Sequence, residues 1–465
     1  MNNQTEQAWL PDFLYHGGQF QSGVAIVADA SGRVVNVVPA DQTRDPIRLR
    51  NRALLPGLIN AHSHAFQRVI RGRTEYRSSD ETDSFWTWRE LMYRAANRLS
   101  PDDVYTASRM AFLEMAVSGI TAIGEFHYLH HAVDGKPYDD PNLLAKEVIR
   151  AAGDVGLRIV LLRVAYARAG YNRDANPLQV RFIQPLDEYL KAVDDLLSNF
   201  SKAGDMVRVG AAPHSVRAVP LDYLKRVVSF ARERRLPVHM HVAEQPAEVS
   251  ACIEEYGRSP VALLDTEGLL SDQFTAVHAI HVSPKAVPSI ARARATVCAC
   301  PSTERNLGDG VVPADSYFEQ GVPIALGTDS QIQIDLLEDA RELEYHLRLQ
   351  RKERNVLARS EDNEQSALAK RLFDCATVTG AVSLGFEGAA LQSGMPADFF
   401  TVDLNDPSIA GAGHADLLSS ILFSLARTAV KDVVVGGRRI VEDGRHFSQD
   451  EVVKDFGALQ RNLWS

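Results

Sequence analysis

The sequence predicts an α/β fold, namely a (β/α)8 TIM-like barrel with a small β-sandwich domain built from both chain ends. Three observations support this fold class. Eight apolar runs alternate with helical patterns through the centre of the 465-residue chain. Both ends, residues 1–52 and 395–446, are rich in short β patterns separated by turn residues. Neither end alone is long enough to close a core, so we expect the two ends to pack together.

We assign residues 1–55 and 386–465 to the two parts of the sandwich domain, and residues 56–385 to the barrel. The eight predicted barrel strands lie, in order, within residues 53–60, 119–126, 156–167, 207–213, 236–242, 274–280, 295–301 and 322–329. Helical patterns between these strands cover residues 101–118, 143–155, 186–200, 221–234 and 247–256. The long insert 71–99 interrupts the alternation, and we expect it to be a poorly fixed loop.

Composition and charge exclude several classes of protein. The 45% hydrophobic fraction suffices for a large core. The sequence contains no run of 18 or more apolar residues, so we expect no membrane span. A net charge of −10 argues against nucleic acid as a partner. The N-terminus lacks a secretory signal pattern, and the four cysteines, with Cys298 and Cys300 as small strand residues, are too few for a disulfide framework. We therefore expect a cytoplasmic protein, and we further expect a homodimer.

The segment 53–68, ALLPGLINAHSHAFQR, carries the first functional signal. Its apolar strand runs into His62-Ser63-His64, and alternate strand side chains share one face, so both imidazoles point the same way. In a barrel, polar residues at the carboxyl ends of strands converge on one site. Most of the predicted strands deliver a histidine or a carboxylate to that rim. This concentration favours a metal site over two polar residues that merely enter a loop.

His62, His64, His241 and Asp329 form a set of three nitrogens and one oxygen, suited to Zn²⁺, with Fe²⁺ as an alternative. His239 shares a strand face with His241, and we choose His241 because it lies nearer the strand end. Asp329 could instead cap a helix. The fourth predicted strand contains no lysine that could bridge two metals. We therefore expect one divalent metal ion per chain.

Two further residues fit the chemistry of a metal-activated water. Glu244 follows His241 by three residues and could carry a proton from that water to a leaving nitrogen. His278, in the sixth predicted strand, could hydrogen-bond the attacking oxygen, although it could also be a satisfied core histidine. His281 is the weaker candidate because its position points it elsewhere.

With these residues in place, the chain resembles the amidohydrolase superfamily over nearly its whole length. The segments that carry the resemblance are LLPGLINAHSH, HMHVAEQ, VHAIHV, LGTDS and MPADFFTVDL with VVVGGRRIVEDG. A closer resemblance, to members that hydrolyse N-formimidoyl-L-glutamate in histidine degradation, depends on HSHAFQR, DSFWTWRELMYR, GEFHYLHH, HSVRAV, AEQ and STERNLGDG.

This resemblance implies hydrolytic deamination to N-formyl-L-glutamate and ammonia. In that reaction a metal-activated hydroxide attacks the formimidoyl carbon, Glu244 shuttles the proton and His278 assists. Asp329 belongs to this catalytic group as well as to the metal ligands. The implied substrate-binding residues are Gln67, Arg89, Tyr128, His214 and Arg217. Gln331 departs from the family pattern, which has a histidine two residues after the ligand aspartate.

The substrate that the resemblance implies is a small dicarboxylate, and Arg89 and Arg217 offer two guanidinium forks for its carboxylates. Because the overall charge is negative, an anionic substrate needs such a local pair. Either arginine could instead form a surface salt bridge. Two other functions stay open. One is another aminohydrolase or chlorohydrolase of the superfamily, such as a guanine deaminase-like enzyme. The other is a non-enzymatic interaction protein on a decayed hydrolase scaffold.

Overall fold

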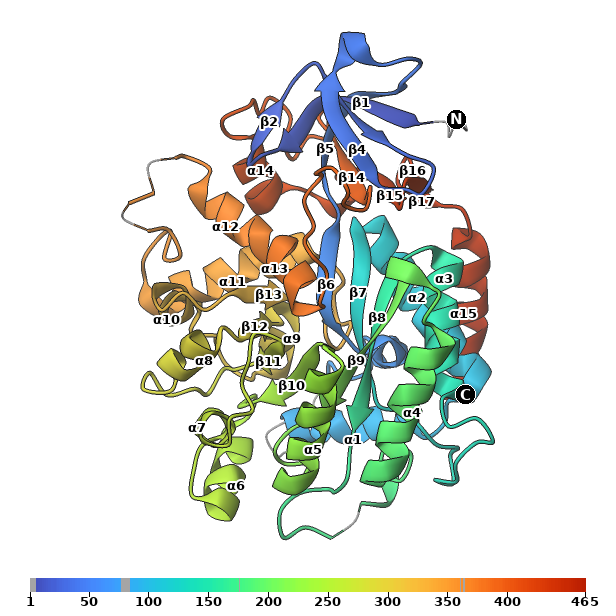
Figure 1. Ribbon diagram of the computed structural model, residues 1–465, viewed down its shortest axis with the longest axis vertical. Coiled ribbons are helices and arrows are strands. Elements are labelled where there is room, and N and C mark those ends of the chain that lie inside the picture. The colour runs from blue at the N-terminus through green and yellow to red at the C-terminus, as the bar shows by residue number, and fades with distance from the viewer. Residues whose placement is uncertain (1–5, 77–83, 175, 360, 363) are drawn as a thin grey trace.

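The computed structural model describes residues 6–76, 84–174, 176–359, 361–362 and 364–465. Eight parallel strands form the barrel, and strands from both chain ends form a separate mixed sheet at one end of it (Figure 1). The barrel strands, in order around the sheet, are β6 (Leu58–Ser63), β7 (Ile120–His127), β8 (Arg158–Ala165), β9 (Val207–Pro213), β10 (Val238–Val242), β11 (Phe274–His278), β12 (Thr296–Ala299) and β13 (Ile324–Leu326). The predicted fold class is therefore confirmed.

The first and last barrel strands meet through the residues that follow them. Ser63 and Asp329 form an isolated parallel bridge. The Asp329 amide donates to the His62 carbonyl and the His64 amide donates to the Asp329 carbonyl, each at 3.0 Å. A Cβ at Gly327 would lie 2.7 Å from the His62 side chain, so this approach requires glycine. Backbone hydrogen bonds thus close the barrel at its carboxyl end, beside the predicted metal ligands.

Helices cover the barrel. The five predicted helices are present as α2 (Pro101–Val117), α3 (Leu143–Val155), α4 (Leu186–Asn199), α5 (Leu221–Glu233) and α6 (Pro246–Tyr256). Further helices of this part of the chain are α1 (Phe85–Ala96), α7 (Pro260–Thr266), α8 (Val287–Ala293), α9 (Pro301–Leu307), α10 (Ala314–Glu319), α11 (Leu336–Arg351), α12 (Ala367–Cys375) and α13 (Val378–Ser383).

The expectation of a poorly fixed loop over residues 71–99 is wrong for the second half of this insert, which forms α1. Ser84 begins the helix: its hydroxyl accepts from the Trp86 amide at 3.3 Å, and the Ser84 amide donates to the Thr87 hydroxyl at 3.1 Å. This capping box satisfies amides that an uncapped helix leaves free. Figure 1 shows α1 crossing the end of the barrel opposite the mixed sheet. Residues 77–83 of the insert lie outside the described residues.

The mixed sheet has the strand order β17-β16-β15-β14-β5-β1-β3-β4, with β2 paired to β1. Its strands are β1 (Gln7–His16), β2 (Gln19–Gln21), β3 (Val24–Ala28), β4 (Val34–Pro39), β5 (Ile47–Pro56), β14 (Phe399–Asp403), β15 (Val430–Val435), β16 (Arg438–Glu442) and β17 (Arg445–His446). Strands that are distant in this order share one buried core, which includes Trp9, Val34, Phe399 and Val434. The chain ends therefore pack together as predicted.

The predicted first barrel strand, residues 53–60, is divided between the two sheets. Residues up to Pro56 belong to β5 of the mixed sheet, and the barrel begins at Leu58. Gly57 lies at the junction, where a Cβ would come within 2.2 Å of the Thr121 hydroxyl. One continuous apolar run in the sequence therefore links both parts of the fold.

Two helices complete the C-terminal part of the chain. α14 (Leu417–Ser424) packs against α11 and α12, and α15 (Gln449–Trp464) packs against α2 on the outside of the barrel. None of the helices in the described ranges is long and apolar enough to cross a membrane. The C-terminal segment thus contacts the barrel as well as the mixed sheet.

Candidate active site

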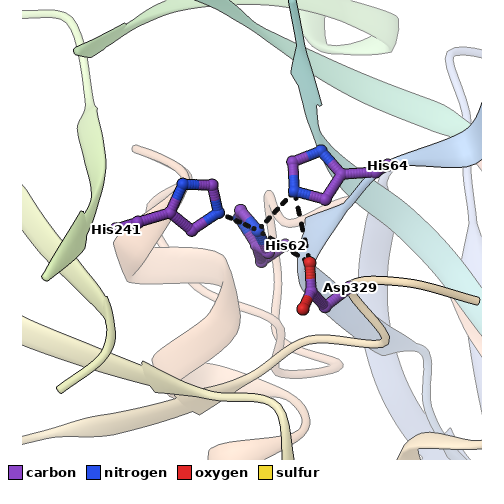
Figure 2. A group of neighbouring side chains, drawn as sticks. All are labelled: His62, His64, His241 and Asp329. Atoms are coloured by element: carbon purple, nitrogen blue, oxygen red, sulfur yellow. Dashed lines mark hydrogen bonds and ion pairs between the residues drawn. The ribbon is translucent and has the colours of Figure 1, made fainter. Parts of the chain in front are cut away.

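The end of β6 presents His62 and His64 on the same side, as the alternation of strand side chains predicts. Their Nε2 atoms lie 3.2 Å apart. His241, near the end of β10, places its Nε2 3.1 Å from that of His62. Asp329 Oδ1 lies 3.3 Å from His62 Nε2 and 3.2 Å from His64 Nε2. Figure 2 shows the three rings and the carboxylate gathered around one point.

Hydrogen bonds orient two of these rings so that their lone pairs face this point. His64 Nδ1 donates to the Phe126 carbonyl at 2.9 Å, and His241 Nδ1 donates to the His214 carbonyl at 3.2 Å. Because a carbonyl only accepts, each Nδ1 carries the proton and each Nε2 keeps its lone pair. The ligand atoms of a tetrahedral zinc site lie about 3.3–3.4 Å apart, given the usual bond lengths. The four residues therefore fit a single metal ion.

Burial keeps His62 and His241 neutral. It lowers the pKa of His62 to about 3 and the pKa of His241 well below its usual value. Burial alone would raise the pKa of Asp329, but the adjacent rings of His62 and His64 hold it well below its usual range. Neutral imidazoles and an ionised carboxylate are the protonation states that a metal ion requires of its ligands.

The two histidines that the sequence analysis weighed less lie away from this point. His239 Nε2 donates to the Ser383 carbonyl in α13 at 2.8 Å. His281 Nε2 donates to the Asp309 carbonyl at 2.9 Å. The geometry therefore agrees with the choice of His241 over His239, and with the lower weight given to His281.

Glu244 and His278 lie beside the four converging groups. His278 Nε2 is 3.7 Å from Glu244 Oε1 and 3.8 Å from Asp329 Oδ2. Its Nδ1 lies 3.3 Å from Oε1 of Glu304, a buried carboxylate that also accepts from the Cys300 amide at 2.8 Å. Burial alone would lower the pKa of His278, but Glu244, Glu304 and Asp329 together raise it well above its usual value. This ring thus carries a positive charge between three carboxylates, with one hydrogen bond from Nδ1 to Glu304.

A second group of potential ligands, His278, Cys300 and Asp329, lies next to the first. Burial raises the pKa of the Cys300 thiol well above its usual value. Because His278 and Cys300 both hold their protons, this group offers fewer free lone pairs than the first. The first group is therefore the better metal site.

Backbone strain is concentrated at the same strand ends. Ala243, His278, Asp329 and Gln331 have φ angles of 52°, 67°, 47° and 61°, in the left-handed region that non-glycine residues rarely adopt. Such conformations persist where the surrounding structure fixes them. Gln331 is fully buried, and its Nε2 donates to the Ser63 hydroxyl at 2.8 Å. Its side chain therefore ties the loop after β13 to β6.

A cavity adjoins these groups. Every predicted site residue lines it except His62, which is fully buried. Residues that the sequence analysis did not single out also line it, namely Phe85, Trp88, Met92, Tyr93, Tyr166 and Leu307. Four of these six lie on α1, so the helix that the sequence analysis missed forms one wall of the cavity.

Arg89 and Arg217 reach the cavity, and neither forms a salt bridge with a described carboxylate. Arg89 is only 8% exposed, and its Nη2 donates to the Tyr166 hydroxyl at 3.1 Å. Nη1 of Arg217 is buried without a hydrogen-bond partner among the described residues. A buried guanidinium needs a counter-charge or full hydrogen bonding to be stable. The two unpaired cations therefore mark a place for an anionic group, rather than surface salt bridges.

The other three predicted substrate-binding residues line the same cavity. Gln67 lies in the short helix η2 (Ala65–Ile70) directly after His64, and its Nε2 donates to the Tyr128 hydroxyl at 2.9 Å. The ring of His214 packs against that of Tyr166, with centroids 4.7 Å apart. Burial, followed by the two nearby arginines, lowers the pKa of His214 well below its usual value. His214 therefore meets a ligand as a neutral ring.

Known proteins resemble this chain in both sequence and structure. The pattern of the Amidohydrolase family matches residues 53–440. The chain belongs to the amidohydrolase family. Formimidoylglutamate deiminase of Pseudomonas aeruginosa is 37% identical over 452 residues, 97% of each chain. A 5-methylthioadenosine/S-adenosylhomocysteine deaminase of Pyrococcus abyssi is 29% identical over 414 residues, 89% of this chain and 87% of that one. The crystal structure of an amidohydrolase from Brucella melitensis gives a TM-score of 0.91 at 32% identity, covering 99% of this chain and 100% of that one.

This amidohydrolase also has site residues that the sequence analysis missed. Glu304 lies within STERNLGDG, a segment that carried the resemblance without a role for this carboxylate. Tyr166 directly follows β8, so its place at a strand end was a usable signal. Gln179, in η3 (Pro177–Gln179), donates to the hydroxyls of Tyr93 and Tyr166, which line the cavity. Its place in the sequence, away from any strand end, gives no indication of these contacts.

Proposed function

We propose that this amidohydrolase hydrolyses N-formimidoyl-L-glutamate to N-formyl-L-glutamate and ammonia, a step of histidine degradation. The observation that carries the proposal is that Arg89 and Arg217 lie beside the candidate metal site without a carboxylate partner among the described residues. The substrate is a dicarboxylate with an amidine-like carbon, and arginine forks bind carboxylates bidentately. The 37% identity to the Pseudomonas enzyme over nearly the whole chain supports the same reaction.

The proposed cofactor is one Zn²⁺ per chain, with Fe²⁺ as the alternative. His62, His64, His241 and Asp329 would hold it, and their near-tetrahedral spacing suits zinc. Such an ion, when bound, lowers the pKa of a water molecule and supplies a nucleophile near neutral pH.

Glu244 is the proposed proton carrier. Burial raises the pKa of its carboxyl group, so it exchanges protons closer to neutral pH than an exposed glutamate does. It takes a proton from the attacking water and delivers a proton to the nitrogen that leaves as ammonia. His278 Nε2, 3.7 Å from Glu244, donates toward the region where negative charge develops, and Asp329 orients both histidine and water.

The proposed binding mode separates the two ends of the substrate. Arg89 and Arg217 hold the carboxylates, while Gln67, Tyr128 and His214 contact the rest of the molecule. A neutral His214 does not repel a cationic amidine group. An uncharged purine would leave both guanidiniums unpaired, which disfavours a guanine deaminase-like reaction.

The proposed setting of the enzyme is the cytoplasm, in agreement with the four free cysteines. A homodimer stays a prediction, and light scattering of the purified protein measures it directly.

Ammonia release tests the function. Metal-loaded protein should release ammonia from N-formimidoyl-L-glutamate with a kcat/KM at least about 100-fold above that for guanine, adenosine or 5-methylthioadenosine, because a group lost from a buried charge pair costs several kcal/mol. Turnover of a purine with none of N-formimidoyl-L-glutamate would reassign the enzyme within the family.

A further inference from the structure

Tyr166 lies at the centre of a cluster of hydrogen-bond donors on the cavity wall. Its hydroxyl oxygen accepts from Arg89 Nη2 at 3.1 Å and from Gln179 Nε2 at 2.6 Å. Tyr166 is 1% exposed and Gln179 is 2% exposed, so water does not replace these contacts. Two donor groups thus contact one phenol oxygen.

The two lone pairs of the Tyr166 oxygen are both occupied. A phenol oxygen has two lone pairs, and Arg89 and Gln179 each donate to one of them. Guanidiniums accept no hydrogen bond, and Gln179 presents its amide nitrogen to Tyr166. The Tyr93 oxygen already accepts from the same nitrogen at 2.7 Å. The Tyr166 proton and Arg217 Nη1 have no hydrogen-bond acceptor among the described residues, so both can donate to a ligand in the cavity.

We propose that Tyr166 is a further substrate-binding residue, whose hydroxyl donates to a substrate carboxylate held by Arg89 and Arg217, and that Gln179 is the positioning residue for this hydroxyl. A carboxylate supplies about four lone pairs, which matches the surplus of donors. The inference rests on the proposed function for the identity of the substrate, and it adds a hydroxyl to a site built from two guanidiniums.

The geometry also explains how the hydroxyl is held. Gln179 Nε2 bridges the hydroxyls of Tyr93, on α1, and Tyr166, after β8. The Asn97 side chain, just past α1, donates to the Leu178 carbonyl at 2.8 Å, which fixes the loop that carries Gln179. The Tyr166 oxygen is therefore restrained from both sides before a ligand enters.

Removal of the Tyr166 hydroxyl tests the proposal. Tyr166→Phe should raise KM for N-formimidoyl-L-glutamate about 10- to 100-fold, the usual contribution of a hydrogen bond to a charged group, and change kcat by less than about threefold. Tyr189→Phe is the matched control, because it removes a fully buried hydroxyl that contacts the Arg163 carbonyl outside the cavity. An unchanged KM in Tyr166→Phe would overturn the proposal.

Two substrate analogues separate carboxylate binding from general damage. N-formimidoyl-4-aminobutyrate lacks the α-carboxylate, and N-formimidoyl-2-aminobutyrate lacks the side-chain carboxylate. The KM penalty of Tyr166→Phe should vanish with one analogue, which identifies the carboxylate that Tyr166 binds. The same penalty with all three substrates would overturn the proposal.

Binding of glutarate, measured by calorimetry, tests the inference without turnover. Tyr166→Phe should weaken glutarate binding about 10- to 100-fold, whereas Tyr189→Phe should not. If the parent protein binds glutarate but does not hydrolyse N-formimidoyl-L-glutamate, the proposed function fails. The comparison of glutarate affinities then still tests whether Tyr166 binds a carboxylate. Equal glutarate affinity in the parent and Tyr166→Phe would contradict that role.

The positioning role of Gln179 requires coupling to Tyr166. Gln179→Met should raise KM about 5- to 20-fold with kcat nearly unchanged, because the hydroxyl loses its fixed direction. In the Tyr166→Phe background the same substitution should raise KM by less than about threefold. Additive effects in the double variant would show that Gln179 does not act through Tyr166.

Discussion

The titratable side chains around this cavity have different protonation states. His62 and His241 are kept neutral by burial, whereas the carboxylates around His278 keep that ring charged. Glu244 faces His278, and its pKa is raised mainly by burial. The site thus contains neutral ligands, a cationic donor and a carboxylate whose pKa is raised by burial, which are the parts that hydrolytic deamination requires.

Glu244→Gln should keep the fold and the metal but lower kcat about 10²- to 10⁴-fold, because the amide keeps the shape of the side chain and cannot carry the proton. Steady-state kinetics and elemental analysis of the same preparation measure both effects. Near-normal turnover in this variant would remove Glu244 from the proposed mechanism.

Arg89→Met and Arg217→Met should each lower kcat/KM, because each leaves a substrate charge without its partner. The loss should correspond to about 2–5 kcal/mol of transition-state stabilisation. Arg→Lys should restore only part of the loss, since a point charge does not replace a planar fork. Assays with N-formimidoyl-L-glutamate measure both sets. Unchanged kcat/KM in both methionine variants would mean that the substrate is not a dicarboxylate.

His239 predicts a pH dependence of stability. Burial lowers the pKa of this fully buried ring to about 4, against about 6.5 in the unfolded chain. Both states are neutral above pH 6.5, and below it only the unfolded chain takes up the proton, so the free energy of unfolding falls between pH 6.5 and 4. His239→Gln should remove up to about 3 kcal/mol of this decrease. Urea unfolding at pH 7.5 and pH 4.5 measures the free energy of unfolding of both proteins. An equal decrease between the two pH values in the parent and in His239→Gln would contradict the role of His239.

The sequence allowed prediction of residues whose function depends on their position after a strand. His62, His64, His241 and Asp329 could be predicted because strand alternation and barrel geometry place them together. Glu304 and Gln179 could not, since a carboxylate on a short helix and an amide on a loop have no periodicity that points to the cavity. Their roles depend on tertiary contacts alone.

Among the helices and strands, α1 contributes most that the sequence analysis did not predict. It carries Arg89 and four residues that line the cavity, yet it lies in an insert outside the barrel alternation. Its capping box at Ser84 was readable, but the aromatic run that follows does not show a regular helical period. The function of this insert therefore depends on how firmly α1 is attached to the loop after β8.

Asn97→Ala tests that attachment. The Asn97 side chain donates to the carbonyls of Tyr93 and Leu178, each at 2.8 Å, and so joins the end of α1 to the loop. Loss of the Asn97 side chain should lower kcat/KM, mostly by raising KM, because Arg89 is held less firmly. The decrease should correspond to about 1–2 kcal/mol of transition-state stabilisation. Thr106→Ala in α2, which removes an exposed hydrogen bond to the Asp102 carbonyl, is the control. Equal kinetics in the two variants would show that α1 does not need this contact.

On the scale of the whole molecule, the candidate metal site and the backbone bridge that closes the barrel share residues. Asp329 gives its side chain to the proposed metal and its backbone to the bridge with β6. The alternation of apolar runs sufficed to predict the barrel and the sandwich from both ends. The division of residues 53–60 between two sheets could not be predicted, because Gly57 interrupts the strand without interrupting its apolar pattern.

Metal removal should therefore affect stability as well as activity. We expect one metal ion per chain, and its removal by a chelator should lower Tm by several degrees, because a ligand at 100 times its Kd stabilises a fold by about 2.7 kcal/mol. Elemental analysis and thermal unfolding of the same samples measure both. Two metal ions per chain would contradict the single-ion site, and an unchanged Tm would contradict the link with barrel closure.

The pairing of β5 with β14 has a consequence for biosynthesis. Leu54 pairs with Thr401, and Ser63 bridges to Asp329, so early strands find their neighbours in segments that the ribosome makes much later. Pairings this distant in sequence slow folding, and the unpaired apolar edge of β5 stays exposed to other chains in the meantime. A nascent chain can place His62 and His64 early, but it gains the Asp329 carboxylate only after thirteen strands have been synthesised. The complete set of proposed metal ligands is thus available only late in synthesis, and a chain released before Asp329 has three of the four ligands and an open sheet edge.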